Sequence, residues 1–440
     1  MSADTLAIVL AAGKGTRMRS ALPKVMHPIG GRPMIEHVLA AAAAAGIEKT
    51  ALVVAPDSDW ARDLPGGPDV FVQDPPLGTA HAVLAARPAV DSAVGAVVVL
   101  FGDNPLITGA SIEKVLARVS GGADIAVLAF EAADPTGYGR VLMEDGALVA
   151  IREERDASAE ERAVTLCNSG IMAIRSGPAL EALDDIGSDN AKGEFYLTEL
   201  IAIGRQRELV MVVEEAAEDE VLGVNDRAQL AEAEEVFQMR MRSAALLHAT
   251  LQAPHTVFFS HDTTLGEDVV VEPNVVFGPG VSVGTGARIR AFSHLEGAIV
   301  SPGAVVGPYA RLRPGAVIGV DARVGNFVEI KNATLGAGAK ANHLSYVGDA
   351  TVGAKANLGA GTITCNYDGK TKAHTEIGEG AFVGSNSALV APVSIGERAY
   401  VGSGSVITDD VPADALAIGR GRQVVKPDRS PARRGGRSDG

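Results

Sequence analysis

The second half of the chain places aliphatic side chains at six-residue intervals, and this spacing constrains the fold more than any other feature. Glycine often follows the aliphatic position, as in VGTGAR, IGVDAR and VGSGSV, which suits a backbone that turns a corner after each short strand. The pattern predicts a parallel β-helix in which each aliphatic side chain stacks on its copy in the next coil. Three runs carry it: Leu265, Val271, Phe277, Val283, Ile289 and Leu295; Val306, Leu312, Ile318, Val324 and Ile330; and Ile377, Val383, Leu389, Ile395, Val401 and Ile407.

The repeat is interrupted in two places. Its register slips between residues 330 and 352, and the stretch TCNYDGKTKAHTE places an insertion between Thr364 and Ile377. Because irregularities in a solenoid often lie on its binding face, these two stretches are expected to carry functional residues.

The first half of the chain alternates apolar strands with helical segments. LAIVLAAG and GAVVVLFGD have the composition of buried strands, and MIEHVLAAAAAAGI between them predicts a helix that ends at Gly46. Such alternation predicts an α/β sheet whose ligands bind at the carboxyl ends of the strands. We therefore expect a first domain at 1–225, a helical linker at 226–252, a β-helix domain at 253–425 and a disordered basic tail at 426–440.

Composition narrows the partners and the compartment. The formal net charge of −15 argues against a nucleic-acid or anionic-membrane partner. The two cysteines, Cys167 and Cys365, are too few for a disulfide framework and favour a reducing compartment. No apolar stretch approaches the roughly 20 residues that span a bilayer, so a cytoplasmic protein without membrane insertion is expected.

The stretch LAIVLAAGKGTRM at residues 6–18 is a strand that breaks into a glycine loop with basic side chains. Its spacing matches neither a Walker A loop nor the dinucleotide motif G-x-G-x-x-G. Glycine amides beside arginine and lysine form a general anion site, although the pattern alone is equally compatible with a simple strand-to-helix turn.

Longer motifs resolve this ambiguity through a family resemblance that covers residues 6–420. LAAGKGTRM followed by LPKVMHPIGGRPMIEHV resembles the signature of sugar-nucleotide pyrophosphorylases. GAGTITCNYDGKTKAHTEIG, with RLRPGA, NHLSYVGD and VGSNSALVAPV, resembles the acetyltransferase half of one bacterial family. Its bifunctional members make UDP-N-acetylglucosamine, a cell-wall precursor, by joining glucosamine-1-phosphate N-acetyltransferase to N-acetylglucosamine-1-phosphate uridyltransferase.

The resemblance implies the fold and the ligands. It implies an α/β chain with an N-terminal Rossmann-like nucleotidyltransferase domain and a C-terminal left-handed parallel β-helix of hexapeptide repeats. The implied substrates are glucosamine 1-phosphate, N-acetylglucosamine 1-phosphate, UTP and acetyl-CoA, with Mg²⁺ as cofactor and a homotrimer as the assembly.

In the first domain the resemblance implies a site for uridylyl transfer, in which a sugar phosphate oxygen attacks the α-phosphorus of UTP and pyrophosphate leaves. This reaction depends mainly on aligning two polyanions and neutralising their charge. Catalytic charge is assigned to Arg17 and Lys24, and Mg²⁺ to Asp103 and Asn225, although Asp103 is also placed to cap the next element. Nucleotide contacts are assigned to Ala11, Ala12, Gly13, Lys24, Gln73, Gly78 and Thr79, and sugar contacts to Gly139, Glu153, Asn168, Tyr196 and Asn225. Phe101 departs from the family, where tyrosine often stands, so that one hydroxyl contact near the sugar nucleotide is in doubt.

In the β-helix the resemblance implies a site for acetyl transfer, which needs a base to accept a proton from the 2-amino group of the acceptor. His343 in NHLSY matches this base, although a lone histidine is more often structural. The sugar phosphate and acceptor are assigned to Arg313, Lys331, Tyr346 and Asn357, and acetyl-CoA to Asn366, Tyr367, Lys372, Ser385, Ser403 and Arg420. The two serines also suit tight β-helix corners, and Cys365 is expected to be a packed residue without a nucleophilic role.

Two other functions remain open at this point. A pyrophosphorylase for a different sugar nucleotide would use its β-helix only for assembly, which His343, Arg313, Lys331 and the CNYDG loop disfavour. A regulatory subunit, like those of translation-factor exchange complexes, would combine both modules without the chemistry, which Arg17, Lys24 and Asp103 disfavour. The first domain excludes an acyltransferase that consists of a β-helix alone.

Overall fold

The computed structural model describes residues 5–93 and 95–427 and divides into two compact units, Met1–Arg240 and Met241–Gly440. We call them unit 1 and unit 2 and describe each by itself. Most of the basic tail predicted at 426–440 lies outside the described residues. None of the helices in the described ranges combines the length and the apolar character that crossing a membrane requires.

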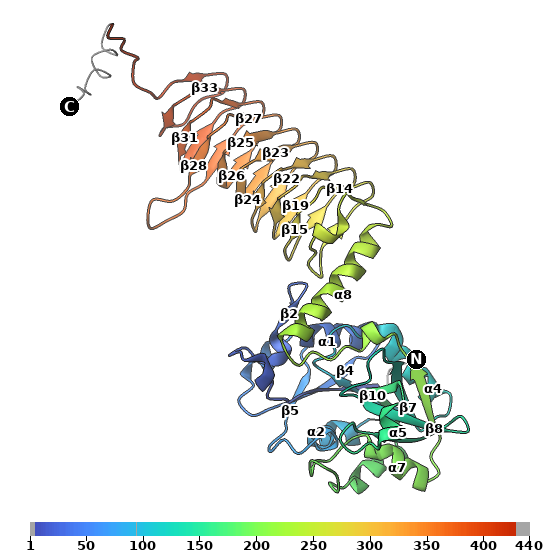
Figure 1. Ribbon diagram of the computed structural model, residues 1–440. Helices are drawn as coiled ribbons and strands as arrows, with labels where there is room; N and C mark the ends of the chain where they lie inside the picture. Colours follow the sequence, from blue (N-terminus) through green and yellow to red (C-terminus); the bar gives the residue numbers. More distant parts are fainter. Residues whose placement is uncertain (1–4, 94, 428–440) are drawn as a thin grey trace, which may run out of the picture. The chain divides into compact units, whose positions relative to one another are not determined.

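Unit 1 is built on a mixed nine-stranded sheet (Figure 1). Neighbouring strands pair in parallel except around β10, which runs antiparallel to both of its main neighbours. A hairpin of β8 (Gly139–Glu144) and β9 (Ala147–Arg152) pairs with the end of β10. In spatial order the main strands are β11 (Met211–Glu215), β7 (Ile125–Glu131), β10 (Leu166–Arg175), β6 (Ala96–Phe101), β1 (Thr5–Ala11), β4 (Lys49–Val54) and β5 (Asp69–Val72).

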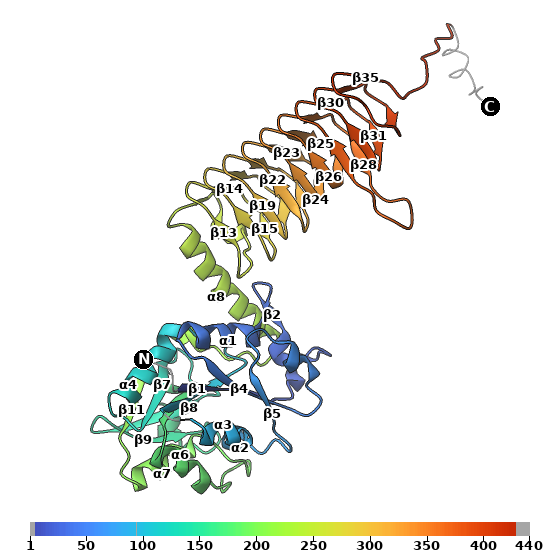
Figure 2. The same cartoon turned by 180° about the vertical axis from the view of Figure 1, so that it is seen from behind.

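Helices cover both faces of this sheet, which explains why its central strands are apolar throughout. Alternate residues of β1 pack into two separate cores, with Ala7 and Val9 in one and Leu6 and Ile8 in the other. The first core packs against α1 (Met34–Ala44) and α4 (Gly109–Ser120), and the second against helices on the opposite side (Figures 1 and 2). These opposite helices include α2 (Thr79–Ala85), α3 (Arg87–Asp91), α6 (Pro178–Glu181) and α7 (Glu199–Gln206), and the short α5 (Ala159–Arg162) follows the β8–β9 hairpin. The predicted α/β sheet is thereby confirmed.

The helix α8 (Arg227–Ala245) carries the chain from unit 1 into unit 2. Within unit 1 its first turns form a small apolar cluster with Ile29 of β2 (Pro28–Ile29). Beside it, Gly30 leads into β3 (Arg32–Pro33), and a Cβ atom on Gly30 would stand 2.2 Å from the Phe237 ring. The beginning of α8 is therefore part of the packing of unit 1.

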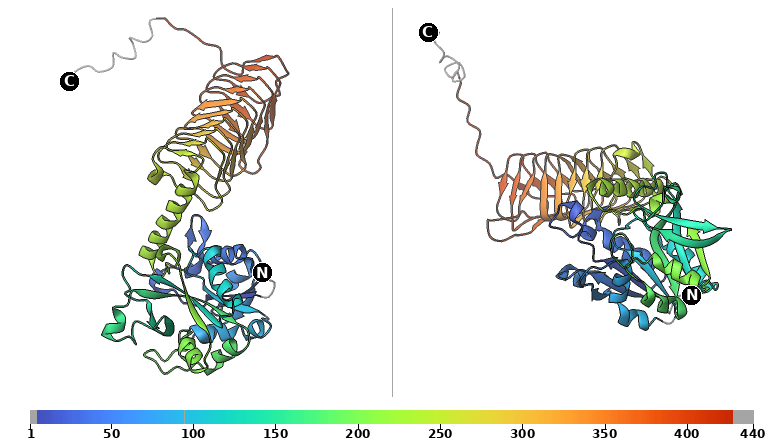
Figure 3. Two further views of the ribbon diagram at one scale, coloured as in Figure 1. Left: turned by 90° about the vertical axis from the view of Figure 1, so that its right-hand side faces the viewer. Right: turned by 60° about the horizontal axis from the view of Figure 1, so that its bottom comes forward.

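Unit 2 is a parallel β-helix of short strands in three stacks, and its coils succeed one another along the unit (Figure 3). The first stack comprises β12 (Thr250–Leu251), β14 (Val270–Val271), β17 (Arg288–Ile289), β20 (Val305–Val306), β23 (Arg323–Asn326), β25 (Lys340–His343), β27 (Asn357–Leu358), β30 (Phe382–Val383), β33 (Tyr400–Val401) and β35 (Leu416–Ala417). The second comprises β13 (Thr264–Leu265), β16 (Ser282–Val283), β19 (Ala298–Val300), β22 (Ala316–Ile318), β24 (Glu329–Leu335), β26 (Tyr346–Val352), β29 (Thr375–Ile377) and β32 (Val393–Ile395). The third comprises β15 (Val276–Phe277), β18 (His294–Leu295), β21 (Arg311–Leu312), the first residues of β24 and β26, β28 (Ile363–Cys365), β31 (Ala388–Val390) and β34 (Val406–Ile407).

The six-residue aliphatic pattern forms the core of unit 2, as predicted. Val271 pairs with Ile289, its third successor in the pattern, and both side chains are fully buried. The predicted slip of register has a simple cause. β24 and β26 each turn a corner of the coil with one residue fewer, so that Leu335 takes the repeat position after Ile330 five residues later instead of six.

The predicted insertion is a loop between β28 and β29. It carries an isolated antiparallel bridge from Tyr367 to Lys372, and Asp368 holds its turn by accepting hydrogen bonds from the amides of Lys370 and Thr371. Figure 1 shows it in orange as a loop that leaves the stacked coils near β28.

Candidate active sites

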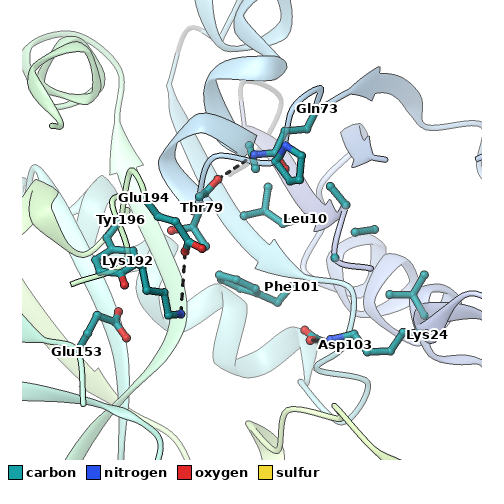
Figure 4. Close-up of a pocket in the computed structure, with 17 residues that line it drawn as sticks. Leu10, Lys24, Gln73, Thr79, Phe101, Asp103, Glu153, Lys192, Glu194 and Tyr196 are labelled. Atoms are coloured by element: carbon teal, nitrogen blue, oxygen red, sulfur yellow. Dashed lines mark hydrogen bonds and ion pairs between the residues drawn. The ribbon is translucent and has the colours of Figure 1, made fainter. Parts of the chain in front are cut away.

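A cavity of about 380 Å³ lies at the carboxyl ends of β1 and β6 in unit 1. Ten of the residues predicted for uridylyl transfer line it, and they come from strand ends and loops distant in the sequence (Figure 4). They are Ala11, Ala12, Gly13, Lys24, Gln73, Gly78, Thr79, Asp103, Glu153 and Tyr196. The structure thus brings most of the predicted set together.

Four predicted residues do not line this cavity. Arg17 lies exposed on the short 3₁₀ helix η1 (Thr16–Met18). Gly139, Asn168 and Asn225 stand behind lining residues and contact them or one another, as described below.

One end of the cavity is organised around the Lys24 ammonium group, whose side chain is 11% exposed. It forms an ion pair with Asp103 and donates a hydrogen bond of 3.2 Å to Oδ1 of Asn225. The amide of Val224 donates to the carbonyl of Asp103, which holds the chain before α8 against the end of β6. A Cβ atom on Gly15, whose φ is +57°, would stand 2.7 Å from Cβ of Lys24, so the glycine loop sets the position of the lysine.

The donors at this end fit a hard divalent cation. Oxygens of Asp103 and Asn225 converge on one cationic group in this structure, and carboxylate and amide oxygens are the ligands that Mg²⁺ prefers. Within the described residues no group of three or more His, Cys, Asp or Glu side chains is arranged to hold a metal. The residues present therefore suit an ion that substrate phosphates and water also coordinate.

A second part of the cavity is formed by Gln73, Gly78 and Thr79. The buried amide of Gln73 donates to the carbonyl of Gly78 at 2.9 Å and lies 3.1 Å from Nδ1 of His81. Gly78 has φ of +122°, and a Cβ atom there would stand 2.5 Å from the carbonyl oxygen of Phe195. This position therefore requires glycine, which brings the backbone close to the cavity.

The third part contains Glu153, whose carboxylate accepts a hydrogen bond of 3.2 Å from the Thr198 hydroxyl. Burial raises the pKa of Glu153 above its ordinary value, and the Thr198 hydroxyl and the Lys192 charge only partly oppose this shift. Gly139 pairs with Asn168, and a Cβ atom on Gly139 would stand 3.7 Å from Oε1 of Glu153. These three residues therefore form one polar group beside the cavity.

A buried arginine supports this polar group, and sequence reasoning missed it. Arg140 is 2% exposed, pairs with Glu154 at 2.7 Å and donates to the carbonyl of Arg162 at 3.2 Å. Arg140 directly follows Gly139, and Glu154 directly follows Glu153, so this ion pair, whose arginine is buried and whose glutamate is partly exposed, links the two backbone segments. Its only sequence signal is an arginine inside a strand.

Three residues outside the predicted set also line the cavity, namely Phe101, Lys192 and Glu194. Lys192 lies 5.7 Å from the centre of the Tyr196 ring and 4.0 Å from Glu194, and neither charged residue was predicted. Phe101 lies between them and Asp103 in Figure 4. It packs on Gly170, where a Cβ atom would stand 2.7 Å from its ring, so this position is an apolar wall of the cavity.

In unit 2, part of the predicted set forms a basic cluster on the third stack. Arg313 donates to Glu329 at 2.7 Å. The amide of Arg313 donates to the carbonyl of Ile330, the residue before Lys331, and the pKa of Lys331 is lowered by the charge of Lys372 and then by that of Arg313. Tyr346 pairs with Glu329 in the next coil and is near enough to affect the Arg313 charge. The cluster suits an anionic group.

Asp349 ties the insertion loop to this region. Its carboxylate accepts hydrogen bonds from the side-chain amides of Asn332 and Asn366. Burial opposes ionisation of Asp349, but these two donors, with the charges of Lys372 and Lys331, hold its pKa below the ordinary value. Asn366 therefore anchors the insertion loop through its hydrogen bond to Asp349, a contact that sequence reasoning did not predict.

His343 lies at the end of β25 in a groove separate from the basic cluster. Its Nδ1 lies 2.9 Å from Oδ1 of Asn326, one coil away. In a neutral imidazole, an Nδ1–H donor to that oxygen leaves Nε2 as the ring nitrogen that can accept a proton, and the residue is exposed. Asn326 was not predicted: three full repeats before His343 is Gly325, and Asn326 stands opposite His343 because this coil is one residue shorter.

The remaining predicted residues lie further along the unit. Arg420 donates to the carbonyl of Ser403, and Ser385 lies one coil before Ser403. Asn357 is half-buried on β27 beside Lys340. Tyr367 is exposed on the insertion loop, and Cys365 is half-buried beside it. No described contact joins them to His343.

Comparison with known proteins gives a match in each unit. Residues 7–166 match the MobA-like NTP transferase domain, and residues 262–297 and 374–409 match the bacterial transferase hexapeptide repeats. The first match covers the strands around the unit 1 cavity, and the second covers the coils of the β-helix.

Curated relatives match nearly the whole chain, and each is named bifunctional protein GlmU. The relative from Azorhizobium caulinodans is 58% identical over 96% of this chain and 95% of its own length. Those from Xanthobacter autotrophicus and Agrobacterium fabrum are 57% and 55% identical over at least 97% of either chain. The chain therefore belongs to the family of bifunctional GlmU proteins.

Proposed function

We propose that unit 1 is an N-acetylglucosamine-1-phosphate uridyltransferase and unit 2 a glucosamine-1-phosphate N-acetyltransferase, so that one chain makes UDP-N-acetylglucosamine in two steps. The single observation that carries the proposal is the convergence of Lys24, Asp103 and Asn225 in the cavity of a chain whose second unit matches bacterial transferase repeats. As part of it we place the uridyltransferase domain at 1–225 and the acetyltransferase domain at 253–425, joined by the helical segment 226–252, whose first turns pack on unit 1.

In unit 1 the glycine loop and Lys24 hold the UTP phosphates, and Arg17 adds a second charge from η1. The buried amide of Gln73 and the backbone of Gly78 and Thr79 face the uracil. Glu153, Asn168 and Gly139 hold hydroxyl groups of the sugar, which suits a carboxylate and an amide. These contacts align the sugar phosphate oxygen with the α-phosphorus, so that the new P–O bond forms as pyrophosphate leaves.

Mg²⁺ is the metal that we propose for Asp103 and Asn225. When bound, it would neutralise charge on the phosphates during transfer. Lys24, which pairs with both residues in this structure, would then turn to the phosphates and leave both oxygens to the ion. Its ammonium group serves the same purpose as the metal, since both offset negative charge.

In unit 2 the acceptor nitrogen attacks the thioester carbon of acetyl-CoA, its N–H proton passes to Nε2 of His343, and the C–S bond breaks. The proton then neutralises the thiolate of CoA. Asn326 keeps His343 in the tautomer that can accept this proton. Arg313 and Lys331 hold the phosphate of the acceptor, and we add Lys372, predicted for acetyl-CoA, because its charge acts on Lys331. Tyr346, Asn357 and Asn366 surround the sugar and acetyl groups. Acetyl-CoA extends past Tyr367, Ser385 and Ser403 to Arg420.

We further propose that the protein is a homotrimer. The predicted acetyl-transfer residues lie in separate groups on exposed faces of unit 2, and neighbouring copies would complete the site between them. Light scattering at micromolar concentration should give a mass of three chains. A monomeric mass with full acetyl transfer would contradict the proposal.

A product assay tests both activities together. The protein is incubated with glucosamine 1-phosphate, acetyl-CoA, UTP and Mg²⁺, and each is omitted in turn. UDP-N-acetylglucosamine should form only in the complete mixture, and omission of UTP should leave N-acetylglucosamine 1-phosphate. Failure of acetyl transfer alone would favour a pyrophosphorylase whose β-helix serves assembly.

A further inference from the structure

A second cavity, of about 510 Å³, lies on the outer face of the first stack in unit 2. Three arginines line it, namely Arg288 on β17, Arg290 just after β17 and Arg323 on β23. His343 lines its other end, together with the side chain of Asn326. We call this cavity the basic groove.

The charge of the basic groove is largely uncompensated. No aspartate or glutamate lines it, and only Arg290 has an acidic neighbour, Glu272 at 3.6 Å. Within residues 5–93 and 95–427, neither Arg288 nor Arg323 forms an ion pair. Two unpaired guanidinium groups over the same strand face strongly favour an anionic ligand.

The spacing of the arginines indicates the kind of anion. Arg288 and Arg323 each pair with Val305, one from either side, so they stand two ladder steps apart. Two steps amount to about 9–10 Å of backbone separation. A single phosphate can contact only one of these two guanidinium groups well, whereas a ligand with several linked phosphates can contact both.

We propose that the basic groove binds a compound with two or more phosphate groups and that its occupant slows acetyl transfer, because it lies beside His343. The groove is separate from the basic cluster of Arg313, Lys331 and Lys372, which lies on the third stack and its loop. The proposal rests on the proposed function for the source of the ligand, since uridylyl transfer handles UTP, UDP-sugar and pyrophosphate, and for the acetyl transfer that the ligand slows.

Equilibrium dialysis of the full chain with labelled pyrophosphate, without divalent metal, tests binding. Both Arg288→Ala/Arg323→Ala and Arg288→Gln/Arg323→Gln, which keeps most of the side-chain volume, should bind one molecule fewer per chain than the parent protein, whose unit 1 cavity and basic cluster also accept anions. The matched control Lys355→Ala/Arg398→Ala removes two exposed, ion-paired cations of the same unit and should bind as many molecules as the parent.

An unchanged count in both arginine pairs would overturn the proposal, and so would an equal loss in the control, which would show binding by total charge alone. Inorganic phosphate should bind the groove at least about tenfold more weakly than pyrophosphate, because it satisfies fewer guanidinium contacts. Equal affinity would overturn the assignment of a polyphosphate.

A second experiment measures the rate of acetyl transfer at constant ionic strength as the pyrophosphate concentration is increased. Half-inhibition of Arg288→Gln/Arg323→Gln should need at least about tenfold more pyrophosphate than that of the parent or the control. Equal sensitivity would contradict the link to His343. Failure of the proposed function is distinguishable, since it appears as missing product in the parent protein before any pyrophosphate is added.

Discussion

The candidate sites of the two units are assembled in different ways. In unit 1, Lys24 contacts partners 79 and 201 residues away, inside one cavity. In unit 2, Arg313, Asn332 and His343 contact partners only 16 or 17 residues away, on exposed or half-exposed surface. A wound sheet gathers distant loops at one edge, whereas a solenoid brings together only residues of successive coils.

This difference predicts how substitutions in each unit affect stability and activity. Loss of one contact in unit 1 disturbs a network that spans the whole unit, while loss of one side chain in unit 2 leaves the neighbouring coils intact. Substitutions in unit 2 should therefore affect activity without stability more often than those in unit 1.

The largest expected effect concerns the edge of unit 1. A fragment that ends at residue 225 loses the packing of Leu230, Ala233, Val236 and Phe237 against Ile29. Its free energy of unfolding should fall by about 3–6 kcal/mol relative to a fragment that ends at residue 245, given the usual worth of apolar burial. Thermal and urea unfolding of the two fragments measure this. Equal stability would show that the first turns of α8 belong to the linker alone.

Replacement of His343 should give the largest effect on activity. His343→Ala should lower acetyl transfer about 10²–10⁴-fold, the usual contribution of a positioned general base. Uridylyl transfer and the unfolding temperature should stay at parent values. His374→Ala, an exposed histidine of the same unit, is the control and should keep both activities. A stable, assembled His343→Ala protein with undiminished acetyl transfer would end the assignment.

Replacement of Asp103 is the counterpart in unit 1. Asp103→Asn should lower uridylyl transfer by about 10²–10³-fold, the usual cost of one lost electrostatic contact to a developing charge. It should also weaken the dependence on Mg²⁺, because the site loses its only carboxylate, while acetyl transfer continues. Pyrophosphate release is measured over a Mg²⁺ titration, with Asp145→Asn as an exposed control. A titration curve like that of the parent would remove Asp103 from the metal site.

The smallest expected effect concerns Glu153, whose pKa is raised by burial. The native state then holds a proton that the unfolded chain releases, so stability falls as the pH rises from the unfolded value of about 4.5 through the raised native value. Glu153→Gln should remove this decline and raise the KM for the sugar phosphate about tenfold, since a charged hydrogen bond is lost. Unfolding temperatures at several pH values, with the exposed Glu144→Gln as control, measure the first effect. A decline that persists in Glu153→Gln would locate the titrating group elsewhere.

More of the structure could be predicted from periodicity alone in unit 2 than in unit 1. In unit 2 the six-residue period identifies which side chains are buried and which coils meet. The pairing of Asn326 with His343 departs from it by one residue, because the two lie 17 and not 18 residues apart. The corner shortened after Ile330 could be located as a slip but not explained, because it depends on how β24 turns from one stack to the next.

In unit 1 the motifs identified most lining residues, but only through the family resemblance. The ion pair of Arg140 with Glu154 could not be predicted, because it depends on the antiparallel pairing of β8 with β9 and β10. Lys192 and Glu194 lie on an irregular segment without periodicity, so nothing local indicates that they reach the cavity. Arg17 was predicted with Lys24 but is not among the residues that line the cavity.

Complementation between two variants tests the central claim, that each unit holds a separate site. Asp103→Asn and His343→Ala are assayed alone and then mixed, with glucosamine 1-phosphate, acetyl-CoA, UTP and Mg²⁺ present. Each variant alone should make little UDP-N-acetylglucosamine, and the mixture should restore its formation because N-acetylglucosamine 1-phosphate passes from one protein to the other. A mixture no more active than either variant alone would contradict two separate sites.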